Sequence, residues 1–124
     1  MITSLIIFAA VNIILWIWVA VVPTFAFSPK WFPESARGMA PFPGIVLVGL
    51  NWRKDESVLA HELHHQVQMK RYSPLGVAIL LGWQYIVGII RGKRGRALYR
   101  SIPLEAEAFE NMDKPITRKY VKFY

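Results

Sequence analysis

The sequence contains no cysteine and few histidines, and both shortages limit what the chain can bind. Without cysteine there is no disulfide framework and no thiolate ligand for a metal. Only three histidines occur among 124 residues. Acidic residues are scarce as well: the chain has eight Asp and Glu against fifteen Lys and Arg, which gives a formal net charge of +7. With 54% hydrophobic residues the chain is too apolar to be disordered, and its length corresponds to one domain.

Side-chain charge is also absent from the first 29 residues, which hold the longest apolar stretch. Within them, the segment 5–22 is interrupted only by Asn12 and is long enough for one membrane-spanning helix, with Pro23 as a natural stop. A cleaved signal peptide would begin with a basic region and end at a small-residue site, and neither is evident. A buried core helix is the other alternative. We predict that residues 1–27 form a transmembrane anchor.

The residues that follow predict an orientation and a linker. Lys30 and Arg37 come soon after the apolar segment, and the positive-inside rule then places the rest of the chain in the cytoplasm. Residues 28–43 contain four prolines and are expected to form an irregular linker. Residues 44–124 remain as the expected folded domain, which contains all three histidines.

A second apolar run covers residues 75–90 and has basic residues on both sides. As a helix it would be about 24 Å long, which is short for a complete membrane crossing. Charge at both ends indicates that both ends lie near the same face. We expect a buried or half-inserted helix, or a hairpin broken at Gly82. The basic cluster at 91–100 is expected to contact anionic lipid headgroups, with nucleic acid as the alternative ligand.

The remaining pattern predicts a mainly α protein with a short β element, an α+β fold. Residues 44–49 are β-branched between two glycines and indicate a strand. Asp55 can cap a helix that runs to about Arg71. Pro103 suits the first turn of another helix, over roughly 103–113. The first of these helices has an apolar stripe for the core, made by Leu59, Leu63 and Val67.

The sequence His-Glu-Leu-His-His at positions 61–65 is the motif that carries chemistry. On a helix, His61 and His65 are one turn apart and face the same way, so both imidazoles can reach one Zn²⁺. Glu62 lies close enough to act as the general base on a metal-bound water, which is the HExxH arrangement. His64 is expected on the flank of the helix, outside the site.

Two histidines do not complete a catalytic zinc site, which needs a third protein ligand. Because the chain has no other His or Cys, that ligand must be an oxygen donor. The candidates that follow the motif are Glu105, Glu107, Glu110 and Asp113. The ligand types favour zinc over other divalent ions. A shared metal also requires the run at 75–90 to fold back, because a single crossing would separate the ligands.

The segments 61–68 and 103–109 resemble those of compact gluzincin metallopeptidases, the minigluzincin-like proteins, over roughly residues 44–112. The resemblance implies an active-site strand, an HExxH helix and a later helix that bears a Glu ligand. Its Glu-x-x-Ala element implies Glu105 as the third ligand. Some members carry Asp where this chain has Phe109, which keeps Glu107 as an alternative. The resemblance also implies that residues 44–49 form the edge strand along which a peptide substrate pairs.

The sequence therefore predicts a membrane-anchored zinc metallopeptidase with His61, His65 and Glu105 as ligands and Glu62 as base. Its expected partners are a peptide or protein substrate and membrane lipid, with no nucleic acid. The alternative is a small membrane protein without hydrolytic activity, whose metal site is structural and which acts by binding a partner. One of three tyrosines, Tyr72, Tyr85 or Tyr99, is expected to donate a hydrogen bond to the oxyanion that forms during peptide hydrolysis.

Overall fold

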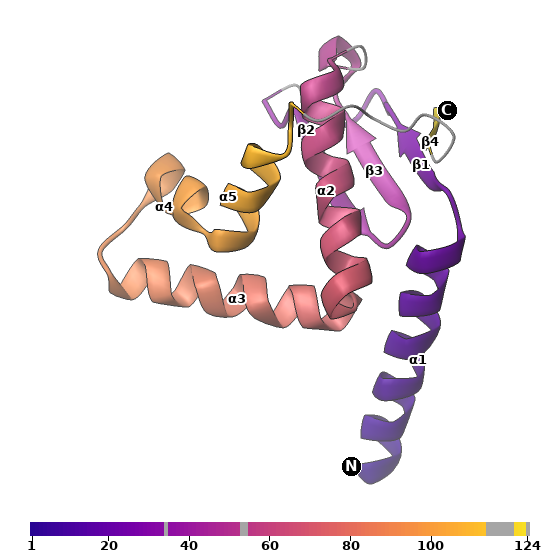
Figure 1. The fold of residues 1–124 in the computed structure, drawn as a ribbon. Coiled ribbons are helices and arrows are strands. Elements are labelled where there is room, and N and C mark those ends of the chain that lie inside the picture. Colours follow the sequence, from indigo (N-terminus) through magenta and orange to yellow (C-terminus); the bar gives the residue numbers. More distant parts are fainter. Residues whose placement is uncertain (34, 53–54, 114–120, 124) are drawn as a thin grey trace.

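A computed structural model describes residues 1–33, 35–52, 55–113 and 121–123 of the chain. The helices are α1 (Ile2–Val21), α2 (Glu56–Tyr72), α3 (Pro74–Ile90), α4 (Gly95–Ser101) and α5 (Pro103–Glu110), with a short 3₁₀ turn at Leu50–Trp52. The strands are β1 (Thr24–Phe27), β2 (Gly38–Phe42), β3 (Ile45–Val48) and β4 (Val121–Phe123). Helix α2 lies between the sheet and the α4–α5 pair (Figure 1). The predicted α+β class, with an apolar N-terminal helix, is confirmed.

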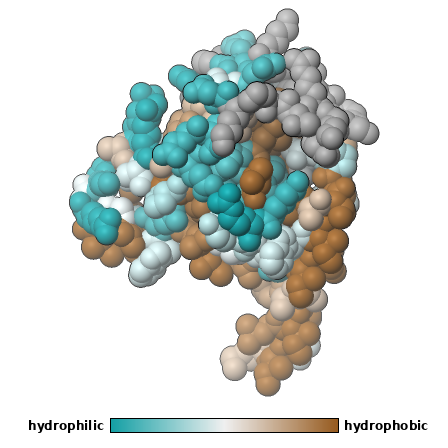
Figure 2. Space-filling model, viewed as in Figure 1, coloured by the Kyte–Doolittle hydropathy of each residue, from teal (hydrophilic) through white to brown (hydrophobic). Residues whose placement is uncertain are grey.

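Helix α1 extends away from the rest of the molecule, with the N-terminus at its free end (Figure 1). It is long and apolar enough to cross a membrane, and it is the one unbroken helix in the described ranges with that property. Only 6% of its most apolar 18 residues are buried, because a single residue of the helix, Val19, packs into the core. Figure 2 shows the apolar surface gathered over α1, below a mostly hydrophilic upper part.

Asn12, a polar residue half-way along α1, joins this helix to the corner between α2 and α3. The chain changes direction by 110° from α2 to α3. Asn12 Nδ2 donates to Ser73 Oγ over 3.2 Å, and the amide of Leu75 donates to Asn12 Oδ1 over 2.9 Å. Nearby, Trp16 Nε1 donates to the carbonyl of Lys70 over 2.7 Å. These bonds satisfy both ends of the Asn12 amide and attach α1 to the domain at the middle of its length.

Helix α2 begins as the sequence predicts, because Asp55 caps it. Asp55 Oδ1 accepts hydrogen bonds from the amides of Ser57 and Val58, at 3.0 and 3.4 Å, and from Ser57 Oγ at 2.6 Å. The cap satisfies amides that have no partner inside the helix. These bonds, the one from the Ser57 hydroxyl above all, lower the pKa of Asp55 below its ordinary value of 3.8.

The lowered pKa of Asp55 predicts a pH-dependent contribution to stability. A carboxyl whose folded-state pKa is lowered stabilises the fold above its unfolded-state pKa and loses this effect as the pH falls through the folded-state value. We expect Asp55→Ala to lower the free energy of unfolding by about 1 kcal/mol at pH 7, and by less at pH 3. Thermal unfolding in detergent measures both values. Asp55→Asn, which keeps an acceptor oxygen, is the control, and an alanine penalty independent of pH would contradict the charged cap.

The sheet has the strand order β2-β3-β1-β4, with β1 parallel to β3 and β4 and with β2 antiparallel to β3. The strand predicted at 44–49 is present as β3, but the expectation that it forms an edge is wrong, because it pairs on both sides. Strand β2 occupies that edge instead. It lies within residues 28–43, so the prediction of an irregular linker is wrong for that part. Pro41 is tolerated there because an edge strand does not need every amide as a donor.

Buried Gln66 of α2 holds the turn between β2 and β3. Its Oε1 accepts from the amide of Gly44 over 2.7 Å, and its Nε2 donates to the carbonyls of Phe42 and Ile45 over 3.2 and 3.3 Å. Gly44 has a φ of +80°, and a Cβ there would lie 2.8 Å from Trp18 Nε1. The turn therefore requires glycine both for its backbone and for its contact with α1.

After α2 the chain crosses the base of the molecule as α3 and then folds back (Figure 1). Helix α3 is continuous through Gly82, so the alternative of a hairpin broken there is wrong. At Gly88 the absence of a side chain lets Leu98 of α4 approach closely. Gln84 Oε1 then accepts from the amide of Leu104, which holds the start of α5 over α3. This return brings α5 back to α2, as a shared metal site requires.

Candidate metal centre

Three buried side chains, His61, His65 and Glu105, form a cluster that can hold a metal ion. Glu105 Oε2 lies 3.2 Å from His61 Nε2 and 3.4 Å from His65 Nε2, and the candidate ligand atoms are all within 4.8 Å of one another. Two atoms that each lie 2.0–2.1 Å from a tetrahedral ion are about 3.3 Å apart. The two separations of 3.2 and 3.4 Å therefore fit a small cation bound in tetrahedral geometry.

The local folding of α2 and α5 explains this convergence. His61 and His65 are one turn apart on α2, and their rings meet edge to face with centroids 5.0 Å apart. Helix α5 begins at Pro103, which suits a first turn, and its first turn carries Glu105. Since α5 packs against α2, this carboxylate points at both imidazoles.

The pKa values of Glu105 and His65 depend on the contact between these groups. Burial by itself raises the pKa of Glu105, but hydrogen bonds from His61 and His65 outweigh it and lower the pKa to about 2. Burial likewise lowers the pKa of His65, yet the hydrogen bond to Glu105 and its charge outweigh burial and raise it. Glu105 is therefore an anion at neutral pH, in a site that attracts a positive charge.

The structure separates Glu105 from the alternative ligand, Glu107. Glu107 Oε1 lies 3.0 Å from His64 Nε2 and 2.8 Å from Arg71 Nη1. These contacts are on the flank of α2, where His64 was expected, and outside the cluster. The structure therefore brings Glu105, and not Glu107, to the two histidines.

Sequence reasoning missed Gln68, which is fully buried beside the cluster. His65 Nδ1 lies 2.9 Å from Gln68 Oε1, and Gln68 Nε2 donates to the carbonyl of Leu104 over 2.8 Å. With Nδ1–H donating to this amide oxygen, Nε2 is the nitrogen of His65 that remains for a metal. Gln68 thus links the orientation of His65 to the position of α5. A glutamine three residues after His65, on the same helix face, is the signal that could have indicated this role.

We expect Gln68→Leu to weaken zinc binding by roughly 10–100-fold, because loss of a partner that orients a ligand typically has this effect. Gln66→Leu is the matched control, since it removes an equally buried glutamine that bonds to the β2–β3 turn and not to a ligand. It should lower the unfolding temperature with a smaller change in zinc affinity. Competition with a chromogenic chelator measures the affinity, and equal losses in both variants would contradict the assignment.

His61 is held in a different way from His65. Its ring packs on Phe109 with centroids 4.4 Å apart, and its Nδ1 is buried without a hydrogen-bond partner among the described residues. Phe109 stands where some of the resembling proteins carry Asp. The aromatic side chain fills that space, so packing positions His61 on this side while hydrogen bonding positions His65.

Glu62 lies next to the cluster and against strand β2. It is buried, and a Cβ on Gly38 would lie 2.7 Å from Glu62 Cγ and 2.9 Å from its Oε1. Glycine at position 38 therefore allows the strand to pass directly over this carboxyl. Burial raises the pKa of Glu62, and the charges of His65 and His61 offset this effect only in part. A carboxylate with a raised pKa accepts a proton more readily than one in water.

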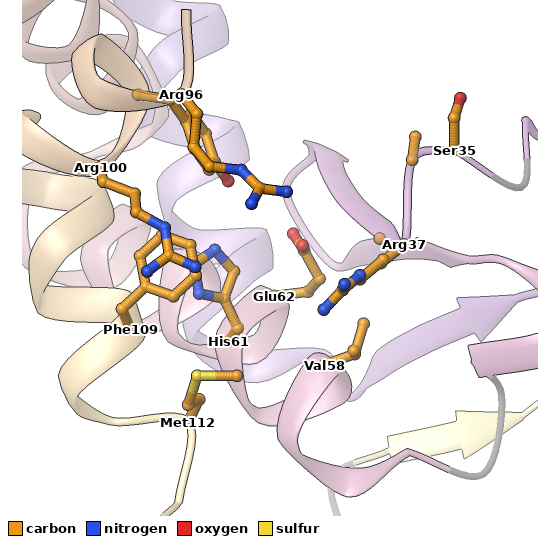
Figure 3. A pocket seen from close by; sticks show the side chains of 12 residues that line it. Ser35, Arg37, Val58, His61, Glu62, Arg96, Arg100, Phe109 and Met112 are labelled. Atoms are coloured by element: carbon orange, nitrogen blue, oxygen red, sulfur yellow. The ribbon is translucent and has the colours of Figure 1, made fainter.

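Two cavities meet at Glu62. One, of about 400 Å³, is lined by Arg37, Arg96 and Arg100 together with His61, and Figure 3 shows these side chains around Glu62. The other, of about 270 Å³, lies on the side of His65 and Glu105 and has a mostly apolar wall. The three tyrosines considered from sequence differ here, because Tyr99 lines both cavities whereas Tyr72 and Tyr85 line neither.

Comparison with known protein families, curated proteins and solved structures gives no match for this chain. The likeness to compact gluzincins therefore stays a resemblance of motifs. The geometry of the cluster stands independently of it and supports binding of a metal ion.

Proposed function

We propose that this protein is a membrane-anchored zinc metallopeptidase. The observation that carries the proposal is the juxtaposition of Glu62 with a cluster of His61, His65 and Glu105 at ligand spacing, where two cavities meet. A structural metal site does not require a buried carboxyl beside it, whereas hydrolysis requires a base there. Zinc, when bound, lowers the pKa of a water molecule and polarises a peptide carbonyl.

The side chains around the cluster then have distinct roles. Glu62 takes a proton from the attacking water and delivers it to the leaving amine. Burial, above all, raises the pKa of Tyr99, so its hydroxyl stays protonated and can donate a hydrogen bond to the developing oxyanion. The outer edge of β2, which has no strand partner among the described residues, offers backbone groups to an extended peptide beside Glu62.

Elemental analysis and peptide hydrolysis test this proposal on the detergent-purified chain. We expect about one zinc per chain and a hydrolytic activity that a chelator removes and added zinc restores. No bound metal after zinc addition would overturn the proposal. Bound zinc that raises the unfolding temperature without any hydrolysis would favour the alternative, a membrane protein with a structural metal that acts by binding a partner.

Helix α3 supplies a second contact with the membrane in this proposal. Its exposed face is apolar, with Ile79 and Trp83 each 63% exposed and Ile90 78% exposed. Basic residues follow directly, at Arg91, Lys93 and Arg94. Because α1 carries the anchor and its midpoint is attached to the start of α3, we infer that α3 contacts lipid as a half-inserted helix. From the basic residues that follow α1 we infer, by the positive-inside rule, that the domain faces the cytoplasm.

The absence of cysteine makes this placement simple to measure, because one introduced thiol carries a single label. We expect a fluorophore on Ile86→Cys, on the exposed face of α3, to be strongly quenched by nitroxide-bearing lipids in vesicles. The same fluorophore on Glu110→Cys, at the exposed end of α5, should be quenched little. Equal weak quenching at both positions would contradict contact between α3 and lipid.

A further inference from the structure

A third cavity, of about 370 Å³, lies between α1, β2 and α3. Its lining is almost entirely apolar and includes Phe8 and Val11 of α1, Pro41 and Phe42 of β2, and Leu75 and Ala78 of α3. We call it the anchor groove. Its wall on one side is the predicted membrane anchor itself, and Phe8 and Val11 are 67% and 48% exposed. The groove thus begins at the surface that lipid is expected to cover.

The anchor groove adjoins the cavity at the metal cluster. Four apolar residues line both the groove and the cavity that contains Glu62, His65 and Glu105, namely Ala40, Met69, Val77 and Leu81. The two cavities therefore lie on either side of these side chains, and strand β2, which lines both, leads from one to the other.

Strand β2 runs along this whole path. Gly38, at its first residue, touches Glu62, while Phe42, at its last, lines the anchor groove. As the outer strand of the described sheet, β2 leaves one edge of backbone donors and acceptors without a strand partner. A polypeptide can pair with that edge, whereas a hydrocarbon chain cannot. The occupant that best fits the groove is therefore an apolar segment of polypeptide.

We propose that the substrate is a membrane-embedded polypeptide, whose apolar segment lies in the anchor groove and whose scissile bond lies at the cluster. The arginine-lined cavity beyond Glu62 then receives the polar portion of the substrate, away from the lipid. This inference rests on the proposed metallopeptidase function and specifies its substrate class. Its physical basis is that the groove and the anchor share one apolar surface, so the segment moves from lipid to protein without crossing water.

Binding of hydroxamates to the zinc-loaded full-length protein tests the groove without a requirement for turnover. Acetohydroxamic acid probes the metal alone. Two tri-leucine peptides, with a hydroxamate at the carboxyl end or attached through a succinyl group at the amino end, add an apolar peptide on either side of the metal. Dodecanoyl hydroxamic acid adds a hydrocarbon chain instead. We expect one of the peptides to bind roughly 100-fold more tightly than acetohydroxamate, because burial of two leucine side chains gives an effect of about this size.

A bulky residue at the mouth of the groove should remove this gain. Ala78→Trp narrows the groove. Ala40→Phe adds bulk where the groove adjoins the metal cavity. Both substitutions should reduce the gain in affinity of the peptide hydroxamate over acetohydroxamate to a few fold. Ile79→Trp, on the adjacent lipid-facing position that does not line the groove, is the matched control and should keep the advantage. The zinc content of each variant verifies that the cluster is intact.

The outcomes separate the two proposals. Acetohydroxamate binding without any peptide advantage, or an advantage that survives both bulky substitutions, would overturn the groove inference while the metal site stands. A larger advantage for the dodecanoyl compound, lost in Ala78→Trp, would overturn it as well and assign the groove to a lipid acyl chain. Failure of the wild type to bind zinc would overturn the proposed function, and the substrate class with it.

Discussion

Replacement of Glu62 by glutamine is expected to leave zinc bound and to lower the rate of peptide hydrolysis by about 10²–10⁴-fold, the usual contribution of a general base. Glutamine has the shape of glutamate and fits the space beside Gly38, but it cannot accept the proton of the attacking water. Glu62 is adjacent to the ligands without being one of them, so the metal should stay in place. Steady-state kcat, measured with the zinc content of the same sample, provides the test.

The stability of Glu62→Gln gives an independent readout. Burial raises the pKa of Glu62, which means that the folded protein disfavours its charge, and a neutral amide avoids this cost. We therefore expect an unfolding temperature equal to or above that of the wild type. Glu110→Gln, an exposed glutamate at the end of α5, is the control and should change neither property. Full hydrolytic activity in Glu62→Gln would rule out the proposed mechanism.

The second large effect is expected on zinc affinity, when one of the proposed protein ligands is removed. We expect His61→Ala and Glu105→Ala to weaken zinc binding by more than the roughly 10–100-fold that follows loss of an orienting partner, because each leaves only two protein ligands. Elemental analysis after dialysis against a weak chelator should find about one zinc per wild-type chain and almost none in these variants.

Glu107→Ala is the matched control for Glu105→Ala, since the two glutamates lie on the same helix with a single residue between them. Glu107 contacts His64 and Arg71 on the flank of α2 and accepts a long hydrogen bond of 3.4 Å from Gln68, but it touches none of the three proposed ligands, so its removal should leave zinc bound. Zinc lost from Glu107→Ala and retained in Glu105→Ala would show that the ligand assignment is wrong. Zinc retained in His61→Ala would contradict the whole cluster.

Local sequence signals were sufficient for the elements whose structure is decided locally. The helix that carries His61 and His65 could be predicted because Asp55 caps it. The apolar stripe predicted to face the core was wrong at Val67, which is 44% exposed, because polar groups of the cluster and Gln66 occupy the buried face. The choice between Glu105 and Glu107 could not be derived from spacing, since two positions on a helix point to different sides and the packing of α5 on α2 decides which side is buried.

Long-range pairing explains the predictions that failed. Strand β2 contains Gly38 and Pro41, which weaken the β pattern, and it forms because β3 and Gln66 bind it. The position of β3 inside the sheet depends on β1, a segment distant in sequence that could not be identified as its partner. Gly82 likewise did not show whether α3 breaks, because a helix tolerates an isolated glycine at a modest cost.

The attachment at Asn12 has a consequence for the response of the protein to bilayer thickness. The residues of α1 that precede this attachment extend about 15 Å beyond the corner of α2 and α3, half of a hydrocarbon core of about 30 Å. Since hydrogen bonds to Ser73 and Leu75 hold α1 at that point, the anchor cannot slide past the domain to relieve hydrophobic mismatch. For the proposed anchor, a change in lipid chain length is therefore expected to shift or tilt the whole molecule and to change the depth of Glu62.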